Sequence, residues 1–187
     1  MALAEQAGLS ELALAKVVID PHGTRVASAA VNPAGKLTSI IAGMAAGADS
    51  IDDLDVIRCG GMGRLFGGVY ACSTLGQFLR EFSHGHTRQL ASVARAHLVN
   101  LVRCSGLLPG LEVQAFIDID SLLRPVYGHA KQGASFGHAK IAGRQVLRKG
   151  LSPLATTIST ADGAPVLTGI GLRGGGKPAP GGARGRW

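Results

Sequence analysis

Through the first half of the chain, apolar residues recur every three or four positions, which is the spacing of one face of a helix. Residues that cap or break helices divide this part into separate segments. The expected helices are 10–20, 37–48, 50–58, 74–82 and 87–104. A glycine-rich connector at 59–70 joins the third and fourth, so these two form a candidate helix-turn-helix unit with an unusually long link.

Three serines are the expected N-terminal caps of these helices, because a serine hydroxyl can accept a hydrogen bond from the free backbone N–H groups of a first turn. They are Ser10, Ser50 and Ser73. Ser50 is followed three positions later by Asp53, which is the spacing of a capping box. The sequence therefore predicts conventional helix starts at these positions.

The period changes after the Leu-Leu-Pro-Gly stretch at 107–110, where adjacent Pro and Gly mark a boundary. From 112 to 120 apolar and polar residues alternate, which predicts a β-strand. Two further strands are expected at 151–160 and 164–172, and the Asp-Gly pair between them is typical of a hairpin turn. The order is therefore helices, then a strand, then an antiparallel hairpin.

This order predicts an α+β protein made of distinct parts. We expect a helical domain at 1–108, a domain containing strands at 109–175, and a disordered tail at 176–187, where Gly, Pro and Arg dominate. The 187 residues are enough to bury a sizeable core. Only 4% of them are aromatic although 46% are hydrophobic, so the apolar content consists mainly of small side chains.

No stretch reaches the roughly 18 uninterrupted apolar residues of a membrane-spanning helix. The N-terminus also lacks the basic-then-apolar order of a signal peptide, so we expect a soluble, cytoplasmic protein without a membrane partner. The three cysteines, Cys59, Cys72 and Cys104, are odd in number and lack CxxC spacing, which fits a reducing compartment. We expect them to be buried free thiols.

The net charge of +7 is unevenly distributed. Residues 1–120 hold 9 Lys and Arg against 11 Asp and Glu, whereas residues 121–187 hold 10 against one. Such a field attracts polyanions, although a solvated basic face is the simpler alternative. The candidate phosphate contacts are basic residues of the second part, namely Lys131, Lys140, Arg144, Arg148, Lys149 and Arg173.

Two carboxylates, Asp118 and Asp120, lie two residues apart on one face of the first predicted strand. Carboxylates this close repel each other unless a cation compensates their charge. Mg²⁺ binds one or two carboxylates together with water and substrate phosphates, and Mn²⁺ is a possible substitute. A solvent-facing polar strand is the alternative, and nucleotide-sugar transferases also use such a DxD pair. The basic residues that follow favour a metal-dependent nucleic-acid enzyme.

Histidines occur as HGH at 84–86 and as His129 and His138 among glycines. Neither pair has the spacing of known metal ligands. We therefore expect these side chains in polar loops or at phosphates. The glycine-rich stretch at 59–68 follows a predicted helix and lacks the ending of a phosphate-binding loop, so it does not indicate a nucleotide site.

The ordered combination of these features resembles a DDE-type transposase of a bacterial insertion sequence. The stretch FIDIDSLLRPVYGHAKQGASFGHAKIAG and the strands after it are similar to the start of that family's catalytic domain. Residues 42–82 are similar to its N-terminal helical region, and the resemblance implies that the helical domain at 1–108 binds DNA. The resemblance covers roughly residues 36–175.

The resemblance implies the first three strands of a ribonuclease H-like α/β domain and Mg²⁺-dependent cleavage and joining of DNA. It implies that Asp120 is the first catalytic and metal-binding carboxylate, with Asp118 as a second candidate. The implied partners are the transposon ends and target DNA, and a second copy of the chain is a further candidate. The family's Asp-Ser-Thr at the strand end is replaced here by Asp120-Ser121-Leu122.

A DDE site also needs a second Asp and a Glu, but only Asp162 follows Asp120. We therefore expect a transposase truncated within its catalytic domain and inactive alone, with a bare sheet edge and a marginally stable second half. The alternative is a non-catalytic DNA-binding fragment of a transposase. A glycosyltransferase would need a nucleotide-binding domain before the DxD pair, and the helical first half argues against it.

Overall fold

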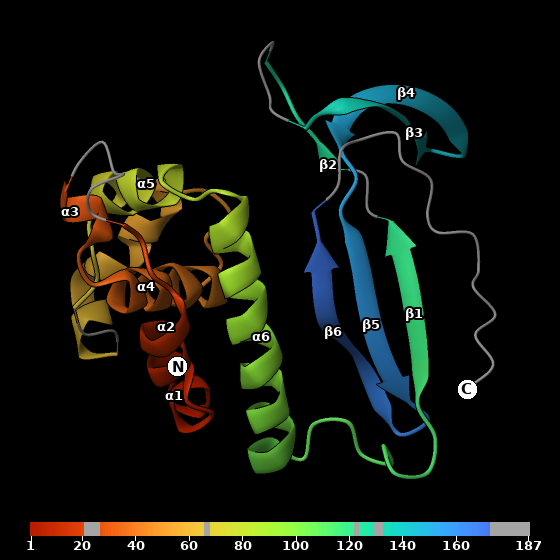
Figure 1. Ribbon diagram of the computed structural model, residues 1–187, viewed down its shortest axis with the longest axis horizontal. Coiled ribbons are helices and arrows are strands. Elements are labelled where there is room, and N and C mark those ends of the chain that lie inside the picture. The colour runs from red at the N-terminus through yellow and green to blue at the C-terminus, as the bar shows by residue number, and fades with distance from the viewer. Residues whose placement is uncertain (21–26, 66–67, 122–123, 129–132, 173–187) are drawn as a thin grey trace. The chain divides into compact units, whose positions relative to one another are not determined.

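A computed structural model of the protein describes residues 1–20, 27–65, 68–121, 124–128 and 133–172. The chain divides into two compact units, Met1–Gly106 and a second that begins at Leu107 (Figure 1). The first unit is helical, and the described part of the second consists of strands and loops. The mixture of helices with antiparallel sheets confirms the α+β class.

The predicted helices of the first unit form with one exception, and three short elements form that the sequence did not predict. Four of the five predicted segments contain an α-helix, whereas 50–58 forms a 3-10 helix. Its three aspartates compete for backbone hydrogen bonds and so favour turns over a regular α-helix. The elements are α1 Ala2–Gln6, α2 Leu9–Lys16, α3 Ala27–Ala30, α4 Pro33–Ala45, η1 Asp52–Arg58, η2 Gly60–Arg64, α5 Cys72–Arg80 and α6 His84–Ser105. The predicted helix-turn-helix unit is therefore wrong.

Two of the three predicted caps are also wrong. Helix α2 begins one residue before Ser10, after Gly8 with a φ of 79°, and α5 begins one residue before Ser73. At the third position, the Ser50 N–H donates to Asp53 Oδ2 at 3.0 Å, and the Asp53 N–H donates to Ser50 Oγ at 3.3 Å. These are the reciprocal hydrogen bonds expected of a capping box, here ahead of a 3-10 helix.

Helix α6 begins with the two histidines that the sequence placed in a loop. Ser83 is its N-cap, and the Ser83 N–H donates to His86 Nδ1 at 2.9 Å, so His86 takes the place of the usual acid in a capping box. The His86 ring also packs on Phe82, with ring centres 5.5 Å apart. The loop prediction for His84 and His86 is therefore wrong, because these contacts make them part of the helix.

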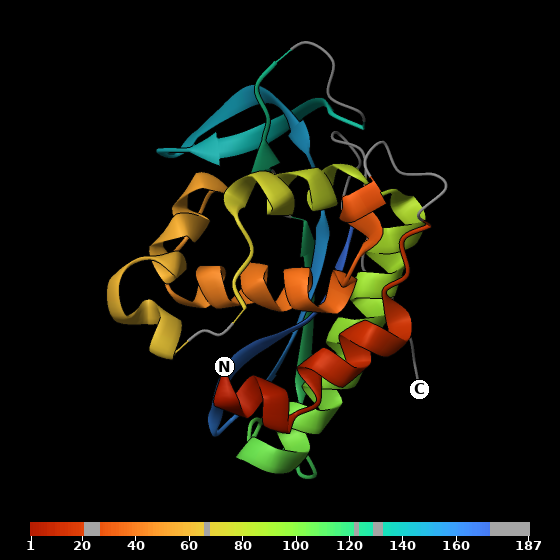
Figure 2. The ribbon, with the colours of Figure 1, turned by 90° about the vertical axis from the view of Figure 1, so that its left-hand side faces the viewer.

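The core of the helical unit lies where α2, α4 and α6 meet, and Figure 2 shows α2 lying along α6. Two polar contacts tie α6 to the N-terminal segment. His97 Nε2 lies 3.1 Å from the carbonyl oxygen of Ala4, and Asn100 Nδ2 donates to the carbonyl oxygen of Ala7 at 3.0 Å. The buried core residues are Leu9, Ala13, Val17, Ala34, Leu37 and Val93.

Lys36 on α4 is buried inside this unit, with only 1% of its surface exposed. Its Nζ lies 5.7 Å from the ring centres of both Tyr70 and Phe78. Burial lowers the pKa of its ammonium group. The ammonium group donates hydrogen bonds to three backbone carbonyl oxygens near the end of α3, those of Ser28, Ala29 and Val31. Lys36 thus supplies a donor to the buried carbonyl group of Ala29 and to two partly buried carbonyl groups beside it.

The second unit contains two small antiparallel sheets, of order β1-β5-β6 and β2-β4-β3. All three predicted strands form, and the turn between β5 and β6 is the predicted hairpin. The hairpin of β3 and β4 was not predicted, although its turn, Ala142-Gly143, has the two positive φ angles of a tight hairpin. The strands are β1 Phe116–Ser121, β2 Arg124–Pro125, β3 Ser135–Ile141, β4 Arg144–Leu151, β5 Leu154–Thr160 and β6 Gly163–Gly171.

Both faces of the β1-β5-β6 sheet carry exposed apolar side chains. Register places Phe116 and Leu167 on one face and Ile117 on the other, and each of the three is at least half exposed. Strand β1 lies at the edge of the sheet, so one side of its backbone has no strand partner among the described residues. The bare sheet edge expected from the sequence is therefore present in the described residues.

Candidate functional site

The two candidate catalytic carboxylates, Asp118 and Asp120, lie on one face of β1. Both are exposed, and they stand opposite Thr157 and Ala155 of β5, respectively. Asp120 Oδ1 accepts a hydrogen bond from the N–H of Ser121 at 2.7 Å, which orients its carboxylate near the end of the strand. The structure thus brings the two predicted site residues together on an edge strand that solvent can reach.

The remaining acid of the second half, Asp162, lies away from this pair. It belongs to the two-residue turn that the Thr160–Gly163 pair closes, whereas Asp120 is opposite Ala155 near the other end of β5. At about 3.3 Å per residue the separation along the strand is roughly 17 Å. Among the described residues, no group of three or more His, Cys, Asp or Glu side chains is placed to hold a metal ion.

Two carboxylates on one face are fewer ligands than a magnesium ion needs, so their fit to Mg²⁺ depends on the other ligands available. Mg²⁺ requires six oxygen ligands and commonly takes only one or two from carboxylates, with water and phosphate oxygens completing the set. Asp118 and Asp120 meet that minimum, and their exposure leaves room for the other ligands. Two carboxylates are too few to hold an ion by protein alone. They fit Mg²⁺ or Mn²⁺ better when a phosphate-bearing ligand supplies some of the remaining oxygen ligands.

The predicted phosphate contacts do not form one surface. Strand register places Arg144 and Arg148 on one face of the β3-β4 hairpin and Lys149, opposite Phe136, on the other. Both arginines are exposed. Lys131, Arg173, the side chain of Lys140 and the tail 176–187 lie outside the described residues.

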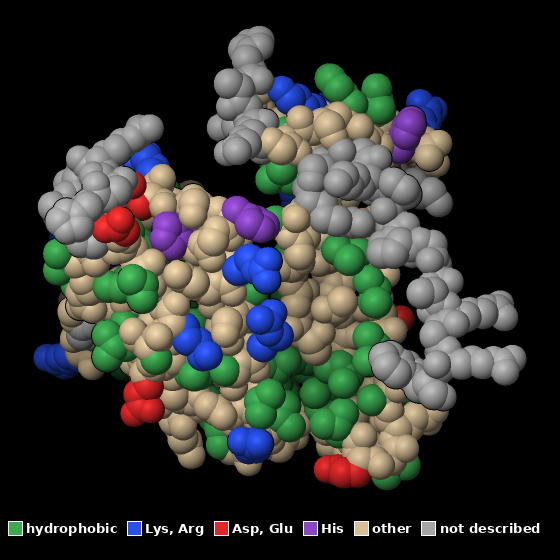
Figure 3. All heavy atoms as spheres, viewed as in Figure 1, with side chains coloured by type: hydrophobic (Ala, Val, Ile, Leu, Met, Phe, Trp, Pro, Cys, Tyr) green, Lys and Arg blue, Asp and Glu red, His purple; other side chains and the backbone are tan. Residues whose placement is uncertain are grey.

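A second basic surface was missed in the sequence. Helix α6 carries exposed arginines at 88, 95 and 103, and Figure 3 shows Lys and Arg side chains along this helix. The spacing of these arginines fits a helical period, but the prediction of this helix used only its apolar positions. The net charge of the first half of the chain does not reveal this basic surface either, because the acids at 49–55 balance the arginines.

Altered pKa values occur in the helical unit and have local causes. The hydrogen bond from Ser50 lowers the pKa of Asp53, and the hydrogen bond from Arg58, 2.7 Å from Asp55, lowers the pKa of Asp55. The pKa of the Cys72 thiol is raised, mainly by burial and to a smaller extent by a hydrogen bond with Asp55. These groups cap a short helix or form surface pairs, so they do not mark a catalytic centre.

Two of the three cysteines contradict the prediction of buried thiols. Cys59 and Cys104 are exposed, and Cys72 is partly buried. Cys59 precedes η2 and Cys104 lies in the last turn of α6, so both occupy surface positions that their residue type did not reveal. All three are free thiols, as expected.

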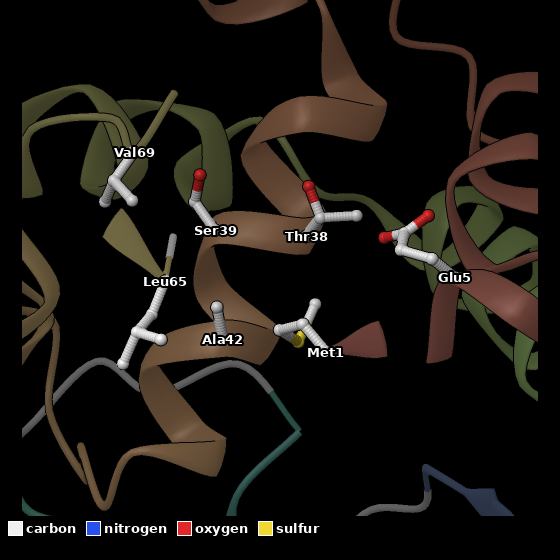
Figure 4. A pocket seen from close by; sticks show the side chains of 7 residues that line it. All are labelled: Met1, Glu5, Thr38, Ser39, Ala42, Leu65 and Val69. Atoms are coloured by element: carbon white, nitrogen blue, oxygen red, sulfur yellow. The ribbon is translucent and has the colours of Figure 1, made fainter. Parts of the chain in front are cut away.

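The cavity beside α1 and α4 does not resemble a catalytic pocket. It has a volume of 160 Å³ and is lined by α1, α4 and the segment after η2 (Figure 4). Its hydroxyl groups are already used, because Thr38 and Ser39 both donate to the carbonyl oxygen of Gly35. The carboxylate of Glu5 points towards Thr38, with no second acid or base among the lining residues. This cavity offers no pair of groups for acid–base chemistry.

Comparisons with models of protein families, with curated proteins and with solved structures find no match. None of the described helices is long and apolar enough to cross a membrane. The function is therefore inferred from the residues and the geometry above.

Proposed function

We propose that the chain is part of a DNA transposase of the DDE type, and that Asp120, with Asp118 beside it, is the first metal-binding carboxylate of the catalytic site. The observation that carries the proposal is the position of these two exposed carboxylates on one face of the edge strand β1. The family likeness of the FIDIDSLLRP stretch supplies the reaction class.

The strand arrangement supports a ribonuclease H-like domain as the setting. In that fold the first acid stands on the first strand, and a hairpin of two further strands follows. Here β1 carries the acids and pairs with β5, which continues into β6 through a two-residue turn. The other edge of β1 is open in the described residues, where such a sheet would continue. The exposed apolar residues on both faces are the positions that further helices would cover.

The chemistry assigned to these residues is phosphoryl transfer on DNA. Divalent ions bound by carboxylates activate an attacking water or 3′ hydroxyl and stabilise the leaving oxygen. Asp120 and Asp118 hold the negative charge that recruits such ions, and the basic residues Arg144 and Arg148 attract the DNA backbone. The substrates are the transposon ends and the target DNA.

This chain supplies one part of the catalytic site. A DDE triad needs further carboxylates, and Asp162, in the turn after β5, is too far from Asp120 to supply one. We therefore expect the chain to bind DNA and divalent metal without cutting the duplex.

The test combines binding and cleavage on one labelled duplex taken from the DNA that flanks the gene. The binding constant is measured at fixed ionic strength with Mg²⁺, with Mn²⁺ and with a chelator. We expect divalent metal to strengthen binding by the wild-type chain but not by the variant D118N/D120N, with no cleavage by either. The matched control, Glu112→Gln, removes an exposed carboxylate of the same unit and should behave as wild type.

Two results would contradict the proposal. An equal metal response in the wild type and in D118N/D120N would show that these carboxylates hold no ion shared with DNA. Cleavage that is lost in Asp120→Ala would instead show that the chain completes its own catalytic site, against the expected inactivity.

The second candidate function is that of a non-catalytic DNA-binding fragment of a transposase. The observation in its favour is that no group of three or more potential metal ligands gathers in the described residues. On this account Asp118 and Asp120 are only the polar face of an edge strand. Salt-dependent DNA binding without any metal effect would favour this function over the first.

A further inference from the structure

Helix α6 presents a row of arginines along one face. Arg88, Arg95 and Arg103 are separated by seven and eight residues, and all three are exposed. At about 100° of rotation per residue, Arg95 lies about 20° around the helix axis from Arg88 and Arg103 about 60° to the other side, so the three arginines fall within an arc of about 80°. His84, one turn before Arg88, is also exposed and extends the row to the start of the helix.

The opposite face of α6 is fixed to the rest of the helical unit. Val93 is 4% exposed and belongs to the buried core, and Gln89 Oε1 accepts a hydrogen bond from the N–H of Val18 at 3.1 Å. His97 and Asn100 contact backbone carbonyl oxygens of the N-terminal segment. These contacts hold the helix in one rotation about its axis, so the arginine face is a rigid, preformed surface.

The charge on this face is a local feature of the helix. The 22 residues of α6 include no Asp or Glu, and an ion pair of the same unit joins Arg58 to Asp55 on η1. Residues 1–106 as a whole hold 9 Lys and Arg against 8 Asp and Glu, so the unit is nearly neutral. Its acids gather elsewhere, with four of them between 49 and 55. The asymmetry concentrates positive charge along α6.

We propose that the arginine face of α6, formed by Arg88, Arg95 and Arg103, binds the phosphate backbone of duplex DNA. At 1.5 Å per residue the arginines are about 10 Å and 12 Å apart along the axis, close to the ~12 Å width of a DNA major groove. Guanidinium groups also match phosphate in shape and bind it through two hydrogen bonds. This inference rests on the proposed function, which makes DNA the polyanion.

The surface does not have the character of a membrane-binding helix. Such a helix needs a broad apolar face next to its basic residues. Between the arginines of α6 the exposed large apolar residue is Val99, whereas the apolar side of the helix is turned into the core. This face is therefore suited to bind a partner through charge rather than through burial of apolar surface.

The test is the salt dependence of DNA binding by the full chain, measured by fluorescence anisotropy of a labelled duplex in EDTA. The triple variant R88Q/R95Q/R103Q is compared with R58Q/R64Q/R80Q, which removes three exposed arginines from other elements of the same unit. Each lost phosphate contact lowers the slope of log K against log [NaCl] by about 0.9. We expect the α6 variant to lose about 2.7 of the wild-type slope and the control variant to keep it.

Three results would overturn the inference: no DNA binding by the wild type, a wild-type slope in the α6 variant, or an equal loss in both triple variants. Tighter arginine-dependent binding to phosphatidylserine vesicles than to DNA would also overturn it. Circular dichroism checks that both variants keep their helices. Because EDTA removes divalent metal, failure of the metal site at Asp118 and Asp120 would leave this test unaffected.

Discussion

The ammonium nitrogen of Lys36 lies 3.1 Å from the carbonyl oxygen of Ala29, in a part of the helical unit where both residues are almost wholly buried. The same nitrogen also donates to the carbonyl oxygens of Ser28 and Val31. A single cation from α4 therefore holds the carbonyl groups at the end of α3 in place of the next helical turn.

Replacing Lys36 by Met should destabilise the helical unit. Met fills much of the same volume but leaves three carbonyl oxygens without their donor, and one unsatisfied buried group costs about 1–3 kcal/mol. We expect the free energy of unfolding to fall by about 2–3 kcal/mol, measured by urea denaturation. The control, Lys16→Met in the last turn of α2, should cost less than about 1 kcal/mol. An equal loss in both variants would contradict this role for Lys36.

The wild type and the Lys36→Met variant also test how the free energy of unfolding depends on pH. Burial lowers the pKa of Lys36 in the folded state, so the unfolded state binds more protons between that pKa and about 10.4. Stability rises with pH wherever the unfolded state binds more protons. The stability difference between wild type and Lys36→Met should therefore widen, in favour of the wild type, as pH rises through this window. A constant difference would show that Lys36 titrates alike in both states.

The buried lysine illustrates what the sequence could not reveal. The segment 37–48 was predicted as a helix from its small apolar residues, and α4 confirms that helix, but a lysine at its start is normally exposed. Its burial depends on the carbonyl groups of α3 and the ring of Tyr70, which the fold brings in from other segments. Local patterns predict elements, whereas the partners of a buried charge are set by tertiary contacts.

Asp53 and Asp55 offer a matched pair of surface carboxylates with lowered pKa values. Ser50 is the main cause for Asp53 and Arg58 for Asp55. Ser50→Ala should raise the pKa of Asp53 and leave that of Asp55 low, and Arg58→Gln should do the reverse. Carboxyl ¹³C chemical shifts followed by NMR during acid titration measure both in one sample. If each variant shifted both carboxylates equally, the local origin of the two effects would be refuted.

In wild type, both carboxylates favour the folded state at neutral pH. A carboxylate with a lowered folded-state pKa adds stability above its unfolded pKa, near 3.9, and loses it as pH falls through the folded value. The Ser50–Asp53 hydrogen bonds should therefore persist at neutral pH and open only in strong acid.

The exposed sheet of the second unit should promote self-association through β1. Ile119 is 55% exposed on an edge strand, and a charge on such a strand opposes pairing with another chain. Ile119→Lys should lower light scattering on heating. The control, Leu14→Lys, adds the same charge at a residue of α2 that is 70% exposed and should leave scattering unchanged. Equal protection by both would assign the effect to net charge rather than to the sheet edge.

The strands of the second unit show which structural features a local sequence pattern can predict. Alternation predicted β1, and the Asp-Gly turn predicted the β5-β6 hairpin, because both signals are local. The β3-β4 hairpin was missed because its basic residues were interpreted only as phosphate contacts. Register then placed Arg144 and Lys149 on opposite faces, which a charge count cannot distinguish. Asp118 and Asp120 share a face as predicted, since a period of two follows directly from strand geometry.

The central claim is that Asp118 and Asp120 bind divalent metal, and paramagnetic broadening by Mn²⁺ in a ¹⁵N–¹H spectrum tests it most directly. The account predicts that substoichiometric Mn²⁺ broadens the amide signals around Asp118 and Asp120, that Asp120→Asn abolishes the effect, and that Glu112→Gln preserves it. Broadening that avoids β1, or that is unchanged in Asp120→Asn, would contradict the account and leave these carboxylates as the polar face of an edge strand.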